Sequence, residues 1–94
     1  MSSDQLVYEL FGMIYPFQIR AARVLLGLSQ QQLAKRSAIG LATLKRIEAA
    51  GAELTGTVQT MSRIQKALES AGIVFINQNA EHGPGLLLRK RLPD

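Results

Sequence analysis

The chain carries few side chains that could perform catalysis or hold a metal ion. It has no cysteine, and its single histidine, His82, lies in a Gly/Pro-rich stretch without a cluster of carboxylates beside it. Ser29 has no nearby base, and no two carboxylates are spaced for acid–base work. Residues 51–56 have the glycine spacing of a phosphate-binding loop, but Thr57 stands where that loop needs a lysine. We therefore predict no enzymatic activity, no metal site and no cofactor.

The basic side chains offer a different chemistry, because they are concentrated in one part of the sequence. The whole chain has a net charge of +4, yet no acidic residue occurs between Leu10 and Ile47. That stretch holds six basic residues, Arg20, Arg23, Lys35, Arg36, Lys45 and Arg46. A cationic stretch inside an otherwise near-neutral chain is typical of a surface that faces a polyanion. A solvated basic face would show the same pattern, so charge alone leaves both interpretations open.

Apolar spacing predicts that the first two elements of this stretch are short helices. Pro16 can open the first helix and Gly27 can end it. The expected apolar stripe of this helix is Ile19, Val24, Leu25 and Leu28. Ser29 is a good N-cap for a second helix, from Gln30 to about Arg36.

Two further helices and a hairpin are predicted downstream. The third helix runs from Leu41 to about Ala50, and the fourth begins after the cap residue Thr57 and ends at Gly72. The expected stripe of the fourth helix is Val58, Met61, Ile64 and Leu68. The β-branched run 73–76 and the apolar run 86–88 flank a turn-rich segment, which predicts a β-hairpin.

These elements predict a mainly α fold of four to five helices with a C-terminal β-hairpin. Residues 1–15 form an N-terminal arm or a further short helix, residues 16–72 a helical domain, and residues 73–94 a hairpin or tail. The apolar side chains of the first and last segments indicate that one or both could form a dimer.

Residues 30–48 have the pattern of a helix-turn-helix. Two short helices are separated by a tight turn, and Ala34 is small where the following helix must cross closely. The residues expected to lock the two helices together are Leu33, Ile39, Leu44 and Ile47. The outer face of the third helix then carries Leu41, Ala42, Thr43, Lys45 and Arg46. Such a helix enters the major groove, where arginine pairs with guanine and methyl groups contact thymine.

The combined spacing resembles the phage-repressor-like helix-turn-helix family, also called the Cro/C1-type or XRE family, over about residues 17–72. The residues that carry the resemblance are Arg23, Gly27 to Gln30, Leu33 to Lys35, Thr43, Leu44 and Arg46 to Glu48. Two positions depart from the family pattern. Ala38 replaces the usual glycine of the turn, and Gly40 replaces the usual hydroxyl cap of the third helix.

The resemblance implies a role for each matching residue. Gln30 would reach the phosphate backbone and a base edge, and Arg23 would form a salt bridge with Glu48. The base-facing positions would be Leu41, Ala42 and Arg46, and the residues nearer the phosphates would be Thr43 and Lys45, with Lys35 as a further candidate. Because Leu41 and Ala42 are apolar, base reading would depend more on van der Waals contact and DNA shape.

We therefore expect a sequence-specific regulator of transcription that binds double-stranded DNA as a homodimeric repressor. A cytoplasmic location is expected, because the start of the chain carries Asp4 and Glu9 without a basic leader and no apolar run could span a membrane. The alternative is an antitoxin of a toxin–antitoxin pair, whose tail binds a partner protein. An adaptor that contacts the transcription machinery and binds DNA weakly is a third possibility.

Overall fold

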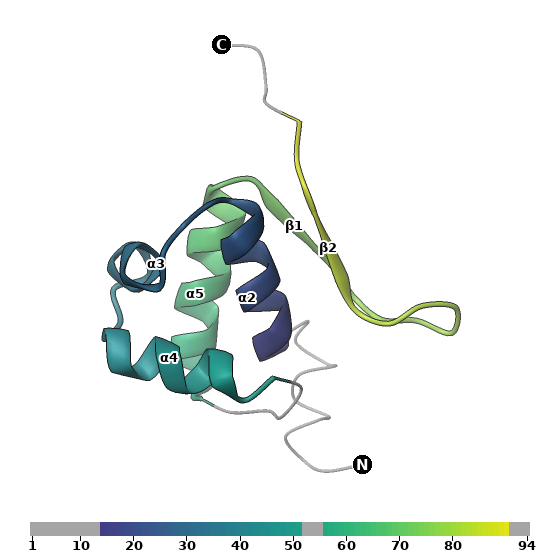
Figure 1. Ribbon diagram of the computed structural model, residues 1–94. Helices are drawn as coiled ribbons and strands as arrows, with labels where there is room; N and C mark the ends of the chain where they lie inside the picture. Colours follow the sequence, from purple (N-terminus) through teal and green to yellow (C-terminus); the bar gives the residue numbers. More distant parts are fainter. Residues whose placement is uncertain (1–13, 52–55, 91–94) are drawn as a thin grey trace.

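The computed structural model describes residues 14–51 and 56–90, and these form a helical bundle with a hairpin at its C-terminal end (Figure 1). The elements are α2 (Pro16–Leu25), α3 (Gln30–Ser37), α4 (Leu41–Ala49), α5 (Val58–Ser70), β1 (Ile73–Ile76) and β2 (Gly85–Leu88). In Figure 1, α2 and α5 lie side by side, α4 crosses near one end of both, and the hairpin lies beside α2. The predicted mainly α fold with a C-terminal hairpin is confirmed. The predicted N-terminal arm or helix falls almost entirely on residues 1–13, outside the described part.

Local hydrogen bonds explain where the helices begin. The Ser29 hydroxyl accepts from the backbone N–H of Gln32 at 3.1 Å, and the Gln32 side chain accepts from the N–H of Ser29 at 2.8 Å. This reciprocal pair satisfies two donors at the start of α3. Thr57 caps α5 through its hydroxyl, which accepts from the N–H of Thr60 at 3.1 Å. Both N-caps were predicted from the sequence, and both are confirmed.

The core lies where α2, α3, α4 and α5 meet. Its buried apolar residues are Ile14, Ile19, Ala22, Leu33, Ala34, Leu44, Ile47, Met61, Ile64, Leu68 and Ile73. Four residues of the predicted stripes are not among them. Val24, Leu25 and Val58 are 63%, 49% and 54% exposed, and Leu28 is half-buried in the loop after α2. The inward face of α2 instead carries Ile19 and Ala22, which are three residues apart. The predicted stripe contained only large apolar residues, and it therefore missed the small Ala22. Val58 is the first residue of α5, before that helix reaches the core.

The turn between α3 and α4 keeps a left-handed conformation although its residue is alanine. Ala38 has φ 56° and ψ 43°, and its N–H bonds to the carbonyls that end α3. The next residue, Ile39, donates to the carbonyl of Ala34 at 3.0 Å and packs partly against the core. An alanine in the left-handed region of backbone angles costs roughly 1–2 kcal/mol. The hydrogen bonds that close the turn and the packing of α3 against α4 offset this cost.

The hairpin is fastened to the helices by packing and by hydrogen bonds. In its antiparallel register Ile73 pairs with Leu88 and Phe75 with Leu86, so one face of the sheet carries these four side chains. Of these, Ile73 is buried in the core, and Phe75 and Leu86 pack partly against it. The buried Gln18 side chain of α2 donates to the carbonyl of Gly85 at 3.0 Å.

Within the described residues, no helix is long and apolar enough to cross a membrane.

Candidate nucleic-acid interface

The outward face of α4 carries the side chains that can meet a ligand. Ala42, Lys45, Arg46 and Ala49 are exposed at spacings of three and four residues, so they form one stripe along the helix. The opposite face buries Leu44, Ile47 and Glu48. Because the buried face is packed into the core, the exposed stripe is held at a fixed orientation.

A buried ion pair connects α4 to α2 and to the loop between α2 and α3. The Glu48 side chain is 3% exposed and the Arg23 side chain 15%. Arg23 Nε donates to Glu48 Oε2 at 2.9 Å and Arg23 Nη2 donates to Glu48 Oε1 at 2.9 Å, which is a two-pronged contact. The remaining nitrogen, Nη1, donates to the carbonyl of Leu28 at 2.9 Å. This guanidinium therefore fixes three segments of the chain at once.

Beside this pair lies a concave surface of about 320 Å³, which we call the basic hollow. Its lining residues are Arg20, Arg23, Gln30, Lys45, Glu48 and Ala49. The charge of Glu48 is compensated by Arg23, whereas Arg20 and Lys45 have no ion-pair partner among the described residues. The net field in the hollow is positive, so it suits an oxyanion such as a phosphate group of a nucleic-acid backbone.

The residues predicted from the sequence do not all lie together. Gln30 opens α3 at the edge of the basic hollow, where its side-chain amide donates to Glu48 Oε1 at 3.4 Å. Lys45 lines the same hollow, and Arg46 follows it on the exposed stripe. Leu41 opens α4 and is half-buried, with part of its side chain against the core. Lys35, in the second half of α3, is exposed and does not line the basic hollow.

Two residues of the site were not assigned from the sequence. The sequence places Arg20 in the basic stretch and predicts no particular role for it, whereas the fold brings it into the basic hollow with Lys45. Its spacing from Arg23, three residues earlier on the same helix, was the available signal. Ala49 lies seven residues after Ala42 and extends the exposed stripe. An alanine carries no charge or hydrogen-bonding group, and only its helical spacing could have identified it.

The comparisons with known proteins agree with this geometry. A family model described as helix-turn-helix matches residues 19–70, a range that contains α3, α4, α5 and the part of α2 from Ile19 onward. The comparison with curated proteins finds no match.

Proposed function

The chain belongs to the Cro/C1-type helix-turn-helix family of DNA-binding regulators, and from this premise we propose that it reads a specific operator sequence through α4 and represses transcription there. The observation that carries the proposal is the coincidence of an outward stripe on α4 with the basic hollow next to it. A repressor of this kind acts by occupying promoter DNA.

In this proposal α4 lies in the major groove with its exposed stripe toward the bases. Arg46 donates to the N7 and O6 acceptors of a guanine, and the methyl group of Ala42 contacts a thymine methyl. The exposed part of Leu41 adds van der Waals contact at the start of the helix. The contacts to the phosphate backbone of the DNA come from Gln30, Thr43, Lys45 and Arg20. Lys35, which lies outside the basic hollow, is a further candidate for such a contact.

The first experiment measures fluorescence anisotropy on a duplex selected from a randomised pool, against a scrambled duplex, at several salt concentrations. Specific binding appears as tighter affinity for the selected duplex, with log K falling linearly in log salt. Replacing Arg46 by alanine is expected to cost about 1–3 kcal/mol and to relax preference at one base position. Lys90→Ala removes one exposed charge that follows β2, outside α4 and the basic hollow, and serves as the matched control. Equal affinities of Arg46→Ala and the unaltered protein for every duplex would refute the assigned reading face.

The phosphate contacts have a separate signature. Arg20→Ala and Lys45→Ala are each expected to weaken binding to the selected and the scrambled duplex by similar factors. Each change should also reduce the slope of log K against log salt by about 1. A slope unchanged in both variants would place the backbone contacts outside the basic hollow.

We propose that the regulator acts as a homodimer joined through the outer face of the hairpin. The face that turns away from the core carries Val74, Ile76 and Leu87, and Leu87 is 45% exposed. A two-stranded sheet with an apolar outer face is poorly stable until another surface covers it. Two copies joined in this way would read half-sites about 34 Å apart on one side of the duplex.

Analytical ultracentrifugation tests the dimer. Leu87→Glu is expected to shift the protein to monomer and to reduce affinity for a two-site operator. Val58→Glu is the control, because Val58 is equally apolar and 54% exposed but lies at the start of α5. Dissociation by Val58→Glu, with Leu87→Glu still dimeric, would move the interface away from the hairpin.

The same exposed apolar face supports one alternative, an antitoxin that holds a partner protein with residues 73–94. The partner would co-purify in stoichiometric amount with the unaltered protein and be lost with Leu87→Glu. A point change is the sharper test, because Ile73 is part of the core and deletion of the segment would unfold the domain.

A further inference from the structure

A second cationic concavity lies between α3 and α5, away from the recognition stripe. Its volume is about 710 Å³, and we call it the α3–α5 hollow. The lining residues are Arg36, Ser37, Ala38, Arg63, Lys66, Ala67, Ser70 and Ala71. It shares no lining residue with the basic hollow, and no residue of α4 lines it. Both surfaces can therefore be occupied at the same time.

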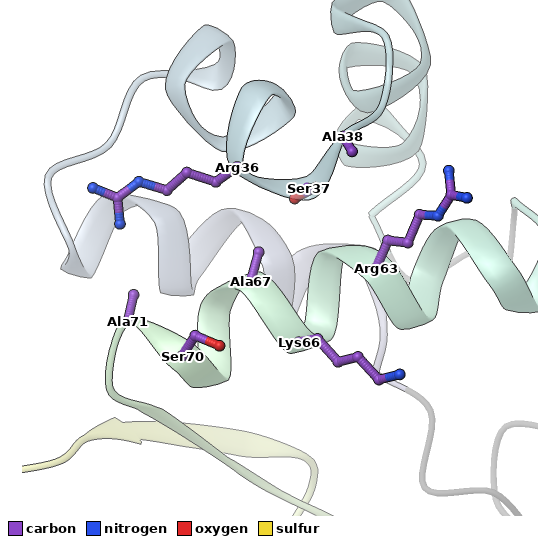
Figure 2. A pocket seen from close by; sticks show the side chains of 8 residues that line it. All are labelled: Arg36, Ser37, Ala38, Arg63, Lys66, Ala67, Ser70 and Ala71. Carbon is purple, nitrogen blue, oxygen red and sulfur yellow. The ribbon is translucent and has the colours of Figure 1, made fainter.

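The charges around the α3–α5 hollow are uncompensated. Figure 2 shows Arg36 extending from α3 and Arg63 and Lys66 extending from α5, all outward around a floor of small side chains. None of the three makes an ion pair or a side-chain hydrogen bond among the described residues. Arg36 lies in the last turn of α3, where a cation favours the helix dipole, but Arg63 and Lys66 are not in the last turn of α5. Two of the three cations thus have no role in stabilising a helix end.

The floor of the hollow is suited to a protein side chain. Ala38, Ala67 and Ala71 present methyl groups, and their small size leaves the space open (Figure 2). The Ser37 hydroxyl in its wall is buried and has no hydrogen-bond partner among the described residues. The site thus offers apolar contact at its centre and positive charge at its rim.

From this arrangement we propose that the α3–α5 hollow docks an acidic segment of a partner protein, with an apolar side chain of the segment on the alanine floor. Carboxylates of the segment pair with Arg36, Arg63 and Lys66, and the guanidinium groups offer two donors to each carboxylate. The hollow opens broadly to solvent, whereas small-molecule sites enclose most of their ligand, so a segment of protein matches its shape better. This inference goes beyond DNA binding, because it gives the regulator a contact for another protein while α4 holds DNA.

The test uses defined peptides on the full-length protein. The probe is a short fluorescein-labelled peptide of Glu and Leu, compared with one of Glu and Ser and one of Lys and Leu. We expect the Glu–Leu peptide to bind most tightly, more weakly at high salt, and to shift the backbone amide NMR signals of Ala38, Ala67 and Ala71. Shifts centred on α4, or no binding at low salt, would overturn the proposal.

Variants separate a specific site from diffuse attraction. Arg63→Ala combined with Lys66→Ala should weaken binding of the Glu–Leu peptide by about tenfold. Arg89→Ala combined with Lys90→Ala removes the same charge from an exposed segment outside the hollow and should leave the affinity nearly unchanged. Equal losses in the two double variants would overturn the proposal. Ser70→Trp keeps every charge but fills the hollow from an exposed position, and it should weaken binding of the Glu–Leu peptide at least as much as Arg63→Ala combined with Lys66→Ala.

Duplex binding by the same variants distinguishes this inference from the proposed function. Arg63→Ala with Lys66→Ala should keep full affinity for the selected duplex, because neither residue lies on α4 or in the basic hollow. A loss of duplex affinity as large as that of Arg46→Ala would make the hollow part of the nucleic-acid interface and refute the docking of an acidic segment. Circular dichroism confirms that each variant is folded.

Discussion

Replacing either partner of the Arg23–Glu48 pair leaves a charge without its counter-charge in a mostly buried position. The Glu48 side chain is 3% exposed, and Arg23 approaches both of its oxygens at 3.1 Å or less. Breaking a buried pair from one side costs about 3–5 kcal/mol. Because the Arg23 side chain is 15% exposed and retains its bond to Leu28, we expect the lower end, about 3 kcal/mol, for Glu48→Leu.

The double variant is predicted to behave differently. Arg23→Met combined with Glu48→Leu removes both charges and leaves apolar groups of similar size, a change that is often close to neutral for stability. A chain of this length has a total stability of roughly 5–14 kcal/mol, so each single variant should still fold. The Tm of Glu48→Leu should fall by about 12–24 °C, whereas the Tm of the double variant should lie close to that of the unaltered protein.

Urea denaturation followed by circular dichroism, on all four proteins of the cycle, gives the coupling free energy between the two positions. We expect a coupling of at least about 2 kcal/mol. If the losses of the two single variants simply add in the double variant, the pair does not act as a buried unit, and the account of how α2 positions α4 is wrong.

Two further predictions concern the end of α3 and the turn that follows it. Ala38→Gly should raise the free energy of unfolding by up to about 1 kcal/mol, because glycine adopts φ 56° without strain. The control is Ala21→Gly on the exposed face of α2, which should lower the free energy of unfolding by about 0.5–1 kcal/mol. A midpoint in urea that is lower for Ala38→Gly than for the unaltered protein would contradict the strained turn. Ser37→Ala removes a buried hydroxyl that lacks a hydrogen-bond partner, so thermal unfolding should show an equal or higher Tm. A fall of more than about 1 kcal/mol in the free energy of unfolding would reveal a hydrogen bond at that hydroxyl.

Helix positions and caps were predictable because they depend on neighbours in the sequence. Ser29 with Gln32, and Thr57 with Thr60, form their bonds within one turn, so local spacing was sufficient to predict two helix starts. The hairpin followed from two apolar runs on either side of a turn-rich segment. The predicted stripe of the first helix was wrong at Val24, Leu25 and Leu28, because the spacing of large apolar residues does not show that a small one, Ala22, occupies the inward position. The stripe of the fourth helix was wrong at Val58, because this residue opens α5 before the helix reaches the core.

The sequence by itself determined the order and type of the described elements, the helix-turn-helix and the pairing of Arg23 with Glu48 that the family resemblance implied. Only the tertiary structure decided which cations share a concavity. Arg20 and Lys45 come together beside one hollow, and Arg36 and Arg63 beside another, although each pair is separated by more than twenty residues. The physical reason is that a cap or a turn is set by bonds within a few residues, whereas the field at a surface is the sum of charges that helix packing brings side by side.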